Sequence, residues 1–256
     1  MKNAGCVLLV LLVAGPARAA VLYVRPPADY TNEIKAGRLK GSIQGAIDDD
    51  ANGDTIVVEE GTYFENINFR GTNIVLTSTD PNNQDVVART IIDGGQNGPV
   101  GSFYSGEGYN APCVLSGFTI TNGKAYYGGG LFCEGSSPTF VNCVISGNYA
   151  IGEGGGIYSN AAGPTLINCI IRRNSAGNGG GMYAWESLPT LTCCIFSNNL
   201  SESYGGGLSS GSSDIGLTNC TFSGNSAGED GGGIYGSYSR PVFTNPHISP
   251  KSYIFR

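Results

Sequence analysis

The chain has 256 residues, with 41 glycines, 14 basic and 20 acidic residues and a formal net charge of −6. This acidic balance argues against a nucleic-acid partner, because phosphate binding requires clustered lysine and arginine. The glycines recur at regular intervals, which separates the chain from a flexible glycine-rich linker.

Residues 1–19 have the pattern of a secretory signal peptide. Lys2 precedes a short apolar run, and Ala17-Arg18-Ala19 offers a cleavage site after Ala19. An anchoring helix is the less favoured alternative, because a membrane span needs ~20 apolar residues and no later run of that length follows. We therefore expect an exported protein, secreted or at the cell surface, with no membrane span and a mature domain at residues 20–256.

A short strand at 21–24 and a loop at 25–41 are followed by a predicted capping helix near 42–50. Ser42 is a suitable N-cap, and Ile43 and the apolar residues after it share one helical face. The acidic run at 48–50 could hold a metal ion, but such runs are more often solvated helix ends, which is the interpretation we favour. Strands are expected at 55–58 and 90–93, with a loop between them at 77–88.

The order of these elements resembles the opening of right-handed parallel β-helix proteins of the pectin-lyase-like superfamily. The resemblance lies in the amphipathic helix, then Gly-Asp-Thr-Ile-Val-Val from Gly53, then Gly-Thr-Tyr-Phe-Glu-Asn-Ile from Gly61. In that superfamily the helix closes the N-terminal end of the coil. The later part of the chain is similar to the repeats of polymorphic outer membrane proteins, which carry Gly-Gly-aliphatic and aromatic-x-x-Asn motifs.

Five glycine triplets, beginning at Gly128, Gly154, Gly179, Gly205 and Gly231, follow one another at steps of 26, 25, 26 and 26 residues. A fixed period of this length is typical of a solenoid. We predict an all-β fold, a right-handed parallel β-helix of about eight coils with three short strands per coil, regular over residues 128–245.

Alignment of the triplets predicts columns of equivalent residues. The residue after each triplet is aliphatic and should point into the core, and the next residue should point outward because neighbouring strand residues face opposite ways. A second column is formed by asparagines that could pass hydrogen bonds from coil to coil. Its expected members are Asn122, Asn148, Asn174, Asn199 and Asn225.

Seven cysteines follow the signal segment, and four of them form a column at the coil spacing: Cys143, Cys169, Cys194 and Cys220. The odd number and the regular spacing favour small buried side chains over disulfides or a metal site. The pair Cys113 and Cys133 is the first to test for a bridge.

The candidate ligand face is the outward aromatic column with Trp185, which shares a face with Tyr183. Its residues are Phe132, Tyr158, Tyr183, Trp185 and Tyr235. Regularly spaced rings could bind a polysaccharide or a cell-surface glycan, although mutual stacking that supports the sheet is the simpler interpretation.

We identify no catalytic, cofactor-binding or metal-binding residue, and we predict a non-catalytic surface or matrix protein that binds carbohydrate or a protein partner. The alternative is a polysaccharide lyase or glycoside hydrolase acting on uronate-containing chains, which needs converging carboxylates or a basic residue near them. The acids of the repeats are scattered, and His247 is isolated. The last coil is irregular, with Pro246 at the cysteine position, so the chain ends in a makeshift cap or is truncated. The sequence indicates no oligomeric state.

Overall fold

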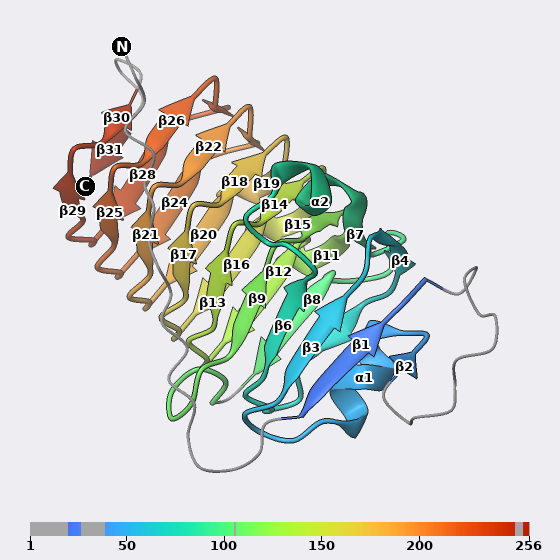
Figure 1. Cartoon of the computed structure of the whole chain (residues 1–256). Helices are drawn as coiled ribbons and strands as arrows, with labels where there is room; N and C mark the ends of the chain where they lie inside the picture. Colours follow the sequence, from blue (N-terminus) through green and yellow to red (C-terminus); the bar gives the residue numbers. More distant parts are fainter. Residues whose placement is uncertain (1–19, 27–38, 105, 249–252, 256) are drawn as a thin grey trace.

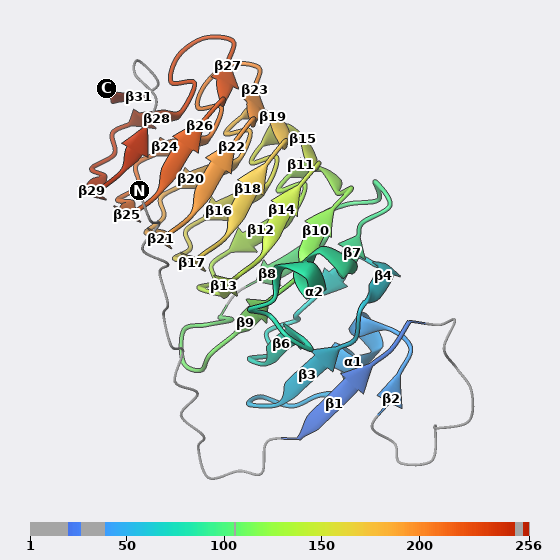
Figure 2. The same ribbon diagram turned by 45° about the horizontal axis from the view of Figure 1, so that its top comes forward.

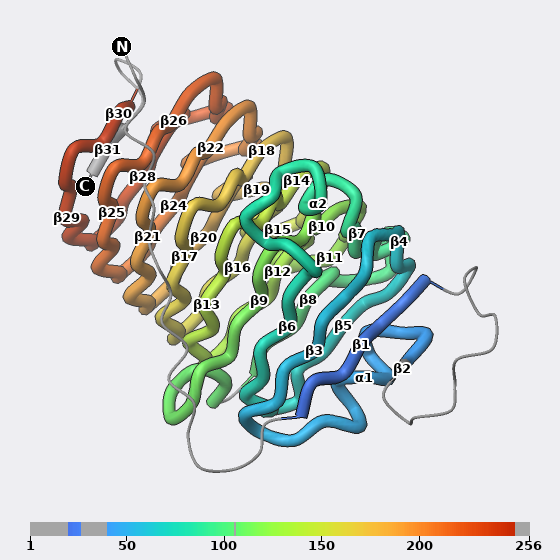
Figure 3. Tube along the Cα trace, in the orientation of Figure 1, coloured from blue at the N-terminus to red at the C-terminus, as the bar shows by residue number. Residues whose placement is uncertain are grey.

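The computed structural model describes residues 20–26, 39–104, 106–248 and 253–255, and the predicted signal segment lies outside them. These residues form a parallel β-helix in which each turn of the chain lies on the previous one (Figure 1). The tube representation follows the coils from the N-terminal end to the C-terminal end (Figure 3). Backbone hydrogen bonds join neighbouring coils at the usual strand spacing of ~4.8 Å.

Four parallel sheets run along the described part of the coil. Sheet A consists of β2 (Leu39–Lys40), β1 (Val21–Val24), β3 (Thr55–Val58), β6 (Val75–Ser78), β9 (Val114–Ser116), β13 (Thr139–Val141), β17 (Thr165–Ile167), β21 (Thr190–Thr192), β25 (Gly216–Thr218) and β29 (Val242–Thr244). Sheet B consists of β4 (Gly61–Phe64), β7 (Thr90–Asp93), β10 (Thr119–Thr121), β14 (Val144–Ser146), β18 (Ile170–Arg172), β22 (Ile195–Ser197), β26 (Thr221–Ser223) and β30 (His247–Ile248). Sheet C consists of β5 (Ile67–Asn68), β8 (Gly101–Tyr104), β12 (Leu131–Glu134), β16 (Ile157–Asn160), β20 (Met182–Trp185), β24 (Leu208–Gly211), β28 (Ile234–Ser237) and β31 (Tyr253–Phe255). Sheet D consists of β11 (Lys124–Tyr127), β15 (Tyr149–Glu153), β19 (Ser175–Asn178), β23 (Leu200–Ser201) and β27 (Ser226–Ala227).

The predicted solenoid is confirmed, and sheet D adds a fourth short strand to the coils that carry the glycine triplets. In a regular coil the chain passes through sheets A, B, D and C in turn. Sheet D forms because the residues just before each triplet are extended and pair in parallel with their equivalents, as Tyr149 does with Ser175. The site described below lies where this extra sheet meets sheet C.

Helix α1 (Ile43–Asp49) contacts the first strands of sheets A and C and covers the N-terminal end of the coil (Figure 1). The Ser42 side chain accepts a hydrogen bond from the Gly45 amide, as expected for an N-cap. Ile43 and Ile47 are buried on the inner face. The helix therefore covers apolar surface that an open coil end would leave in water.

A second helix, α2 (Gln84–Arg89), occupies a segment that we expected to be loop. The Asn83 side chain caps it by accepting from the Asp85 amide, and Val86 and Val87 are buried. The helix packs beside β7 and β10 on sheet B (Figure 2), where the Thr119 hydroxyl donates to the Val87 carbonyl. The loop prediction was wrong because this short helix is stabilised by contact with a sheet formed elsewhere in the sequence.

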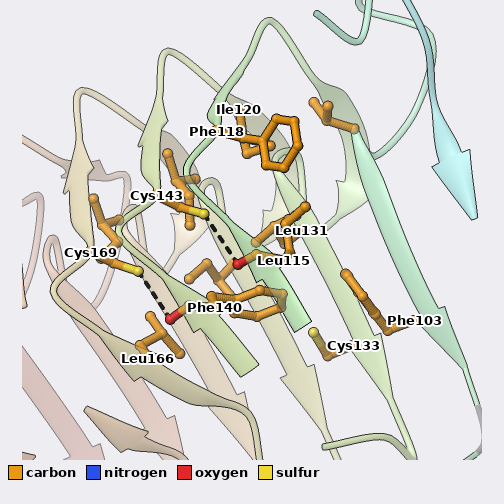
Figure 4. Packing of buried hydrophobic residues seen from close by; sticks show 14 of the residues in the cluster. Phe103, Leu115, Phe118, Ile120, Leu131, Cys133, Phe140, Cys143, Leu166 and Cys169 are labelled. Atoms are coloured by element: carbon orange, nitrogen blue, oxygen red, sulfur yellow. Dashed lines mark hydrogen bonds between the residues drawn. The ribbon is translucent and has the colours of Figure 1, made fainter. Parts of the chain in front are cut away.

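The core is built from columns of apolar side chains, including Leu131, Ile157 and their equivalents after each triplet. The cysteine column lies inside it, and all four thiols are free and buried. Figure 4 shows the Cys143 thiol directed at the Leu115 carbonyl, 3.5 Å away, and the Cys169 thiol directed at the Phe140 carbonyl, 3.4 Å away. These cysteines act as small core residues with weak donors, as predicted.

The asparagine column forms a continuous hydrogen-bonded ladder between coils. The Asn148 side-chain amide donates to the Asn174 side-chain oxygen at 3.1 Å, and Asn174 donates to Asn199 at the same distance. Each side-chain oxygen also accepts from a backbone amide of the preceding coil, as Asn174 does from Asn148 at 3.0 Å. The ladder satisfies polar groups that are buried at this bend.

The assignment of Asn122 to this ladder was wrong. Thr121 pairs with Ser146, so Asn122 is equivalent to Gly147, and Gly123 occupies the ladder position. The Gly123 amide donates to the Asn148 side-chain oxygen, while the Asn122 side chain donates to Asp93. Spacing alone was misleading because Asn122 is itself a left-handed turn residue, with φ of 58°, and lies one position before the ladder position.

Candidate functional site

The predicted aromatic column lies on the outer side of sheet C in the expected register. Phe132 pairs with Tyr158, and Tyr158 pairs with Tyr183. Ser209 then interrupts the column before Tyr235 continues it. The structure therefore brings the first three rings together and separates Tyr235 from them by one coil.

The three rings stack on one another. The ring centroids of Phe132 and Tyr158 are 5.4 Å apart, and those of Tyr158 and Tyr183 are 5.9 Å apart with planes 3° from parallel. Tyr158 is consequently only 8% exposed. Because the faces contact each other, this column presents ring edges and hydroxyl groups outward and supports the sheet as stacked aromatics do.

Sheet D extends the aromatic cluster. Tyr127, which directly precedes a glycine triplet, stacks on Tyr158 of the next coil at 4.8 Å, and Tyr126 packs against Tyr127 at 4.6 Å. The left-handed Gly128 turns the chain back so closely that a Cβ atom there would lie 3.0 Å from the Cα of Phe132. The triplet thus folds the end of each sheet D strand against the start of the adjoining sheet C strand.

Glu153 occupies the position equivalent to Tyr127 in the next coil. The Tyr183 hydroxyl interacts with the Glu153 carboxylate closely enough that each shifts the pKa of the other. Burial raises the pKa of Tyr158 to about 12, with the Glu153 charge as the next cause, and the same two causes raise the pKa of Tyr183. Both hydroxyls therefore stay protonated and remain donors at neutral pH.

Trp185 lies two residues beyond Tyr183 on the same side of sheet C. A Cβ atom at Gly211, its neighbour in the next coil, would lie 2.5 Å from Cε3 and Cζ3 of the indole ring. The six-membered ring thus lies across the bare backbone of Gly211. Trp185 is 42% exposed, so it still presents surface to solvent.

We call this combined surface the tyrosine face. It comprises Tyr126, Tyr127, Phe132, Glu153, Tyr158, Tyr183 and Trp185. Tyr126, Tyr127 and Glu153 were missed in the sequence, although each stands one or two residues before a triplet. Their position just before a triplet could have indicated that they belong to this face, but only the tight turn of the triplet brings them against the rings of sheet C.

Tyr235 belongs to a second, smaller cluster. It stacks on Tyr204 with ring centroids 4.5 Å apart. Tyr204 again directly precedes a triplet, and interaction with the Glu229 carboxylate raises the pKa of its hydroxyl. An aromatic residue that directly precedes a triplet therefore stacks on a ring of the next coil in two places, Tyr127 on Tyr158 and Tyr204 on Tyr235.

The acidic run at the C-terminal end of α1 is only partly solvated. Asp48 pairs with Arg70 at 3.1 Å and Asp49 pairs with Lys40, while burial raises the pKa of Asp50 to about 6. In the described part of the chain, no group of three or more His, Cys, Asp or Glu side chains is arranged to hold a metal ion. Cys113 and Cys133, our first candidates for a bridge, are both free and buried.

Comparison with known proteins finds two stretches of this chain, residues 142–160 and 219–237, that match the Chlamydia polymorphic membrane protein repeat. Each stretch runs from a left-handed turn through the asparagine ladder and a triplet to a strand of sheet C, which is β16 in the first stretch and β28 in the second. The predicted resemblance of these repeats is confirmed.

None of the curated proteins matches this chain. A solved structure of pectin methylesterase from carrot is similar with a TM-score of 0.47 and 14% sequence identity, over 96% of this chain and 90% of that one. The parallel β-helix assignment itself stands on the register of the four sheets. Among the described residues, no helix is long and apolar enough to cross a membrane.

Proposed function

We propose that this chain is an exported, non-catalytic β-helix protein that binds carbohydrate through the tyrosine face. The main supporting observation is that stacked rings lie beside a carboxylate: Tyr158 stacks on Tyr183, and the Glu153 charge is close enough to raise the pKa of both tyrosines. Sugars are recognised by such combinations, in which rings supply apolar area and polar groups bind hydroxyls.

Rigidity favours binding at this surface. The rings are held on strands whose backbone pairs with coils on both sides, and Tyr158 is fixed between Phe132 and Tyr183. A side chain that is already immobile loses little conformational entropy when a ligand arrives. Regular placement along several coils also suits a chain-like ligand.

Catalysis of glycoside hydrolysis by the usual route requires two carboxyl groups on either side of the bond that breaks. On the tyrosine face, Glu153 interacts with the Tyr183 hydroxyl, and the other acid near Tyr158, Glu134, is exposed on the surface. This arrangement favours binding over the polysaccharide lyase or hydrolase that the sequence left as the alternative.

Export to the medium or the cell surface is part of the proposal. It is supported by the signal-peptide pattern of residues 1–19 and by the two stretches similar to a membrane protein repeat. A protein partner carrying sugars would be recognised through the same face.

The test is a glycan array probed with the mature chain and with a triple variant, Tyr158→Ala, Tyr183→Ala and Trp185→Ala. We expect the wild type to bind at least one class of glycan and the variant to lose that binding while its circular dichroism spectrum is unchanged. Binding that survives in a folded variant, or the absence of any bound glycan, would contradict the proposal. Release of reducing ends or unsaturated products would instead support the enzyme alternative.

A further inference from the structure

We infer that the tyrosine face selects neutral sugar chains, and that the stacking positions are two exposed rings seated on glycines, Trp185 on Gly211 and Tyr126 on Gly152. This inference rests on the proposed function and specifies its ligand. The neutral ligand inferred here differs from the uronate-containing polysaccharides that a lyase or hydrolase of this fold would act on.

The two seats share one geometry. A Cβ atom at Gly152 would lie 2.8 Å from Cε1 of Tyr126, much as a Cβ at Gly211 would meet the Trp185 indole. In both cases a ring lies against backbone that carries no side chain. Tyr126 is 59% exposed and Trp185 is 42% exposed, so each ring keeps surface free for a ligand.

The stacked column cannot take this role, because its ring faces are already in contact. Tyr127 and Tyr183 lie on either side of Tyr158 in the cluster, at 4.8 and 5.9 Å. What the column contributes is hydroxyl groups and the Glu153 carboxylate. The seated rings therefore supply apolar contact, and the column supplies hydrogen bonds.

The charges of the face set the class of sugar. Glu153 belongs to the cluster, and Glu134 is close enough to Tyr158 to raise its pKa. Glu186 directly follows Trp185 and is exposed. Carboxylates accept hydrogen bonds from sugar hydroxyls but repel the carboxylates of a uronate chain. A neutral polysaccharide offers hydroxyl donors to these carboxylates and carries no negative charge for them to repel.

The chain contains a single tryptophan, so its fluorescence reports on the Trp185 seat alone. We expect titration with the neutral polymers hydroxyethylcellulose and dextran to give a saturable change in emission with at least one of them. Polygalacturonate and alginate should give none at the same ionic strength. A response to polygalacturonate or alginate but not to the neutral polymers would overturn the inference and leave the proposed function standing.

Affinity electrophoresis in gels containing the neutral polymer then compares variants. Trp185→Ala and Tyr126→Ala should each raise Kd roughly tenfold, as expected for the loss of one aromatic contact. Phe64→Ala is the matched control, because Phe64 is an aromatic residue that is 76% exposed on sheet B. Equal retardation of Trp185→Ala and wild type would refute the Trp185 seat.

Gly211→Ala tests the seat without removing the ring. The added methyl group should displace the indole, shift the emission of the unliganded protein and weaken binding as much as Trp185→Ala does. Gly216→Ala makes the same change on sheet A, where the nearest atoms would be 3.8 Å away, and should alter neither property. Unchanged emission and affinity in Gly211→Ala would show that glycine does not position this ring.

Discussion

At the scale of single residues, the three adjacent acids at the C-terminal end of α1 behave differently because their surroundings differ. Asp48 and Asp49 are paired with Arg70 and Lys40. Asp50 has a side-chain oxygen, Oδ2, that is buried and has no hydrogen-bond partner in the described part of the chain. Burial, followed by the charges of Asp54 and Asp49, raises its pKa from 3.8 to about 6. The sequence predicts the acidic run, but only the fold distinguishes its members.

Asp50→Asn should therefore stabilise the protein at neutral pH. Because the folded pKa exceeds the unfolded value, the folded state binds the proton more tightly, and stability falls as pH rises from about 4 through about 6. Removing the charge should raise the free energy of unfolding at pH 7.5 by up to about 1 kcal/mol after solvent screening, and leave it nearly unchanged at pH 4. Thermal unfolding at both pH values measures this, with Asp48→Asn as control. An equal shift at both pH values would contradict the assignment.

At the scale of elements, each regular coil turns at residues in the left-handed region. One column of such residues contains Asn142, Asn168, Cys193, Asn219 and Asn245, all with φ between 48° and 56°. Asparagine tolerates this conformation better than most residues, which explains a second asparagine column beside the cysteines. The first glycine of each triplet occupies another such turn, at φ of 62° to 69°.

The second glycine of a triplet is required for a different reason, which is close approach of backbone. A Cβ atom at Gly180 would lie 2.2 Å from the Leu200 carbonyl oxygen and 2.8 Å from that of Gly206. Backbone on both sides cannot move away without separating the coils, so Gly180→Ala should destabilise the fold by about 3 kcal/mol or more. Urea unfolding followed by circular dichroism measures this. Gly216→Ala, which meets no close atom, should change stability by less than about 0.5 kcal/mol, and similar losses in both variants would exclude the packing explanation.

At the scale of the whole molecule, stability is distributed along the coil, because each coil contacts only its neighbours. In the described part of the chain the last coil is less well packed. Its strand β30 has two residues, and Phe243 is only partly buried against the core. We expect local opening to begin at this end and to be rare in the middle coils.

The free thiols allow this gradient to be measured. Cys220 is the ladder cysteine nearest the last coil, and a hydrogen bond with Cys194 lowers its pKa, whereas burial raises the pKa of Cys143. Its position near the less well packed end and its lower pKa should both make Cys220 react first with an alkylating reagent, since the thiolate is the reactive form. Mass-spectrometric mapping over time should find Cys220 modified before Cys143. Simultaneous modification of all ladder cysteines would indicate that the coil opens as one unit.

The sequence by itself determined the solenoid, the inward aliphatic and cysteine columns and most of the asparagine ladder, because these depend on a period that is visible in the chain. The tertiary structure decided what depends on how neighbouring coils meet. The shift of one residue at Asn122, the pairing of sheet D and the contact of Tyr127 with Tyr158 all follow from turn conformation and coil stacking. The same holds for Trp185, whose partner Gly211 is 26 residues away and becomes its neighbour only when the coils are in register. The spacing of residues in the sequence identifies equivalent positions in successive coils, but contacts between the coils decide which face of each ring stays exposed to a ligand.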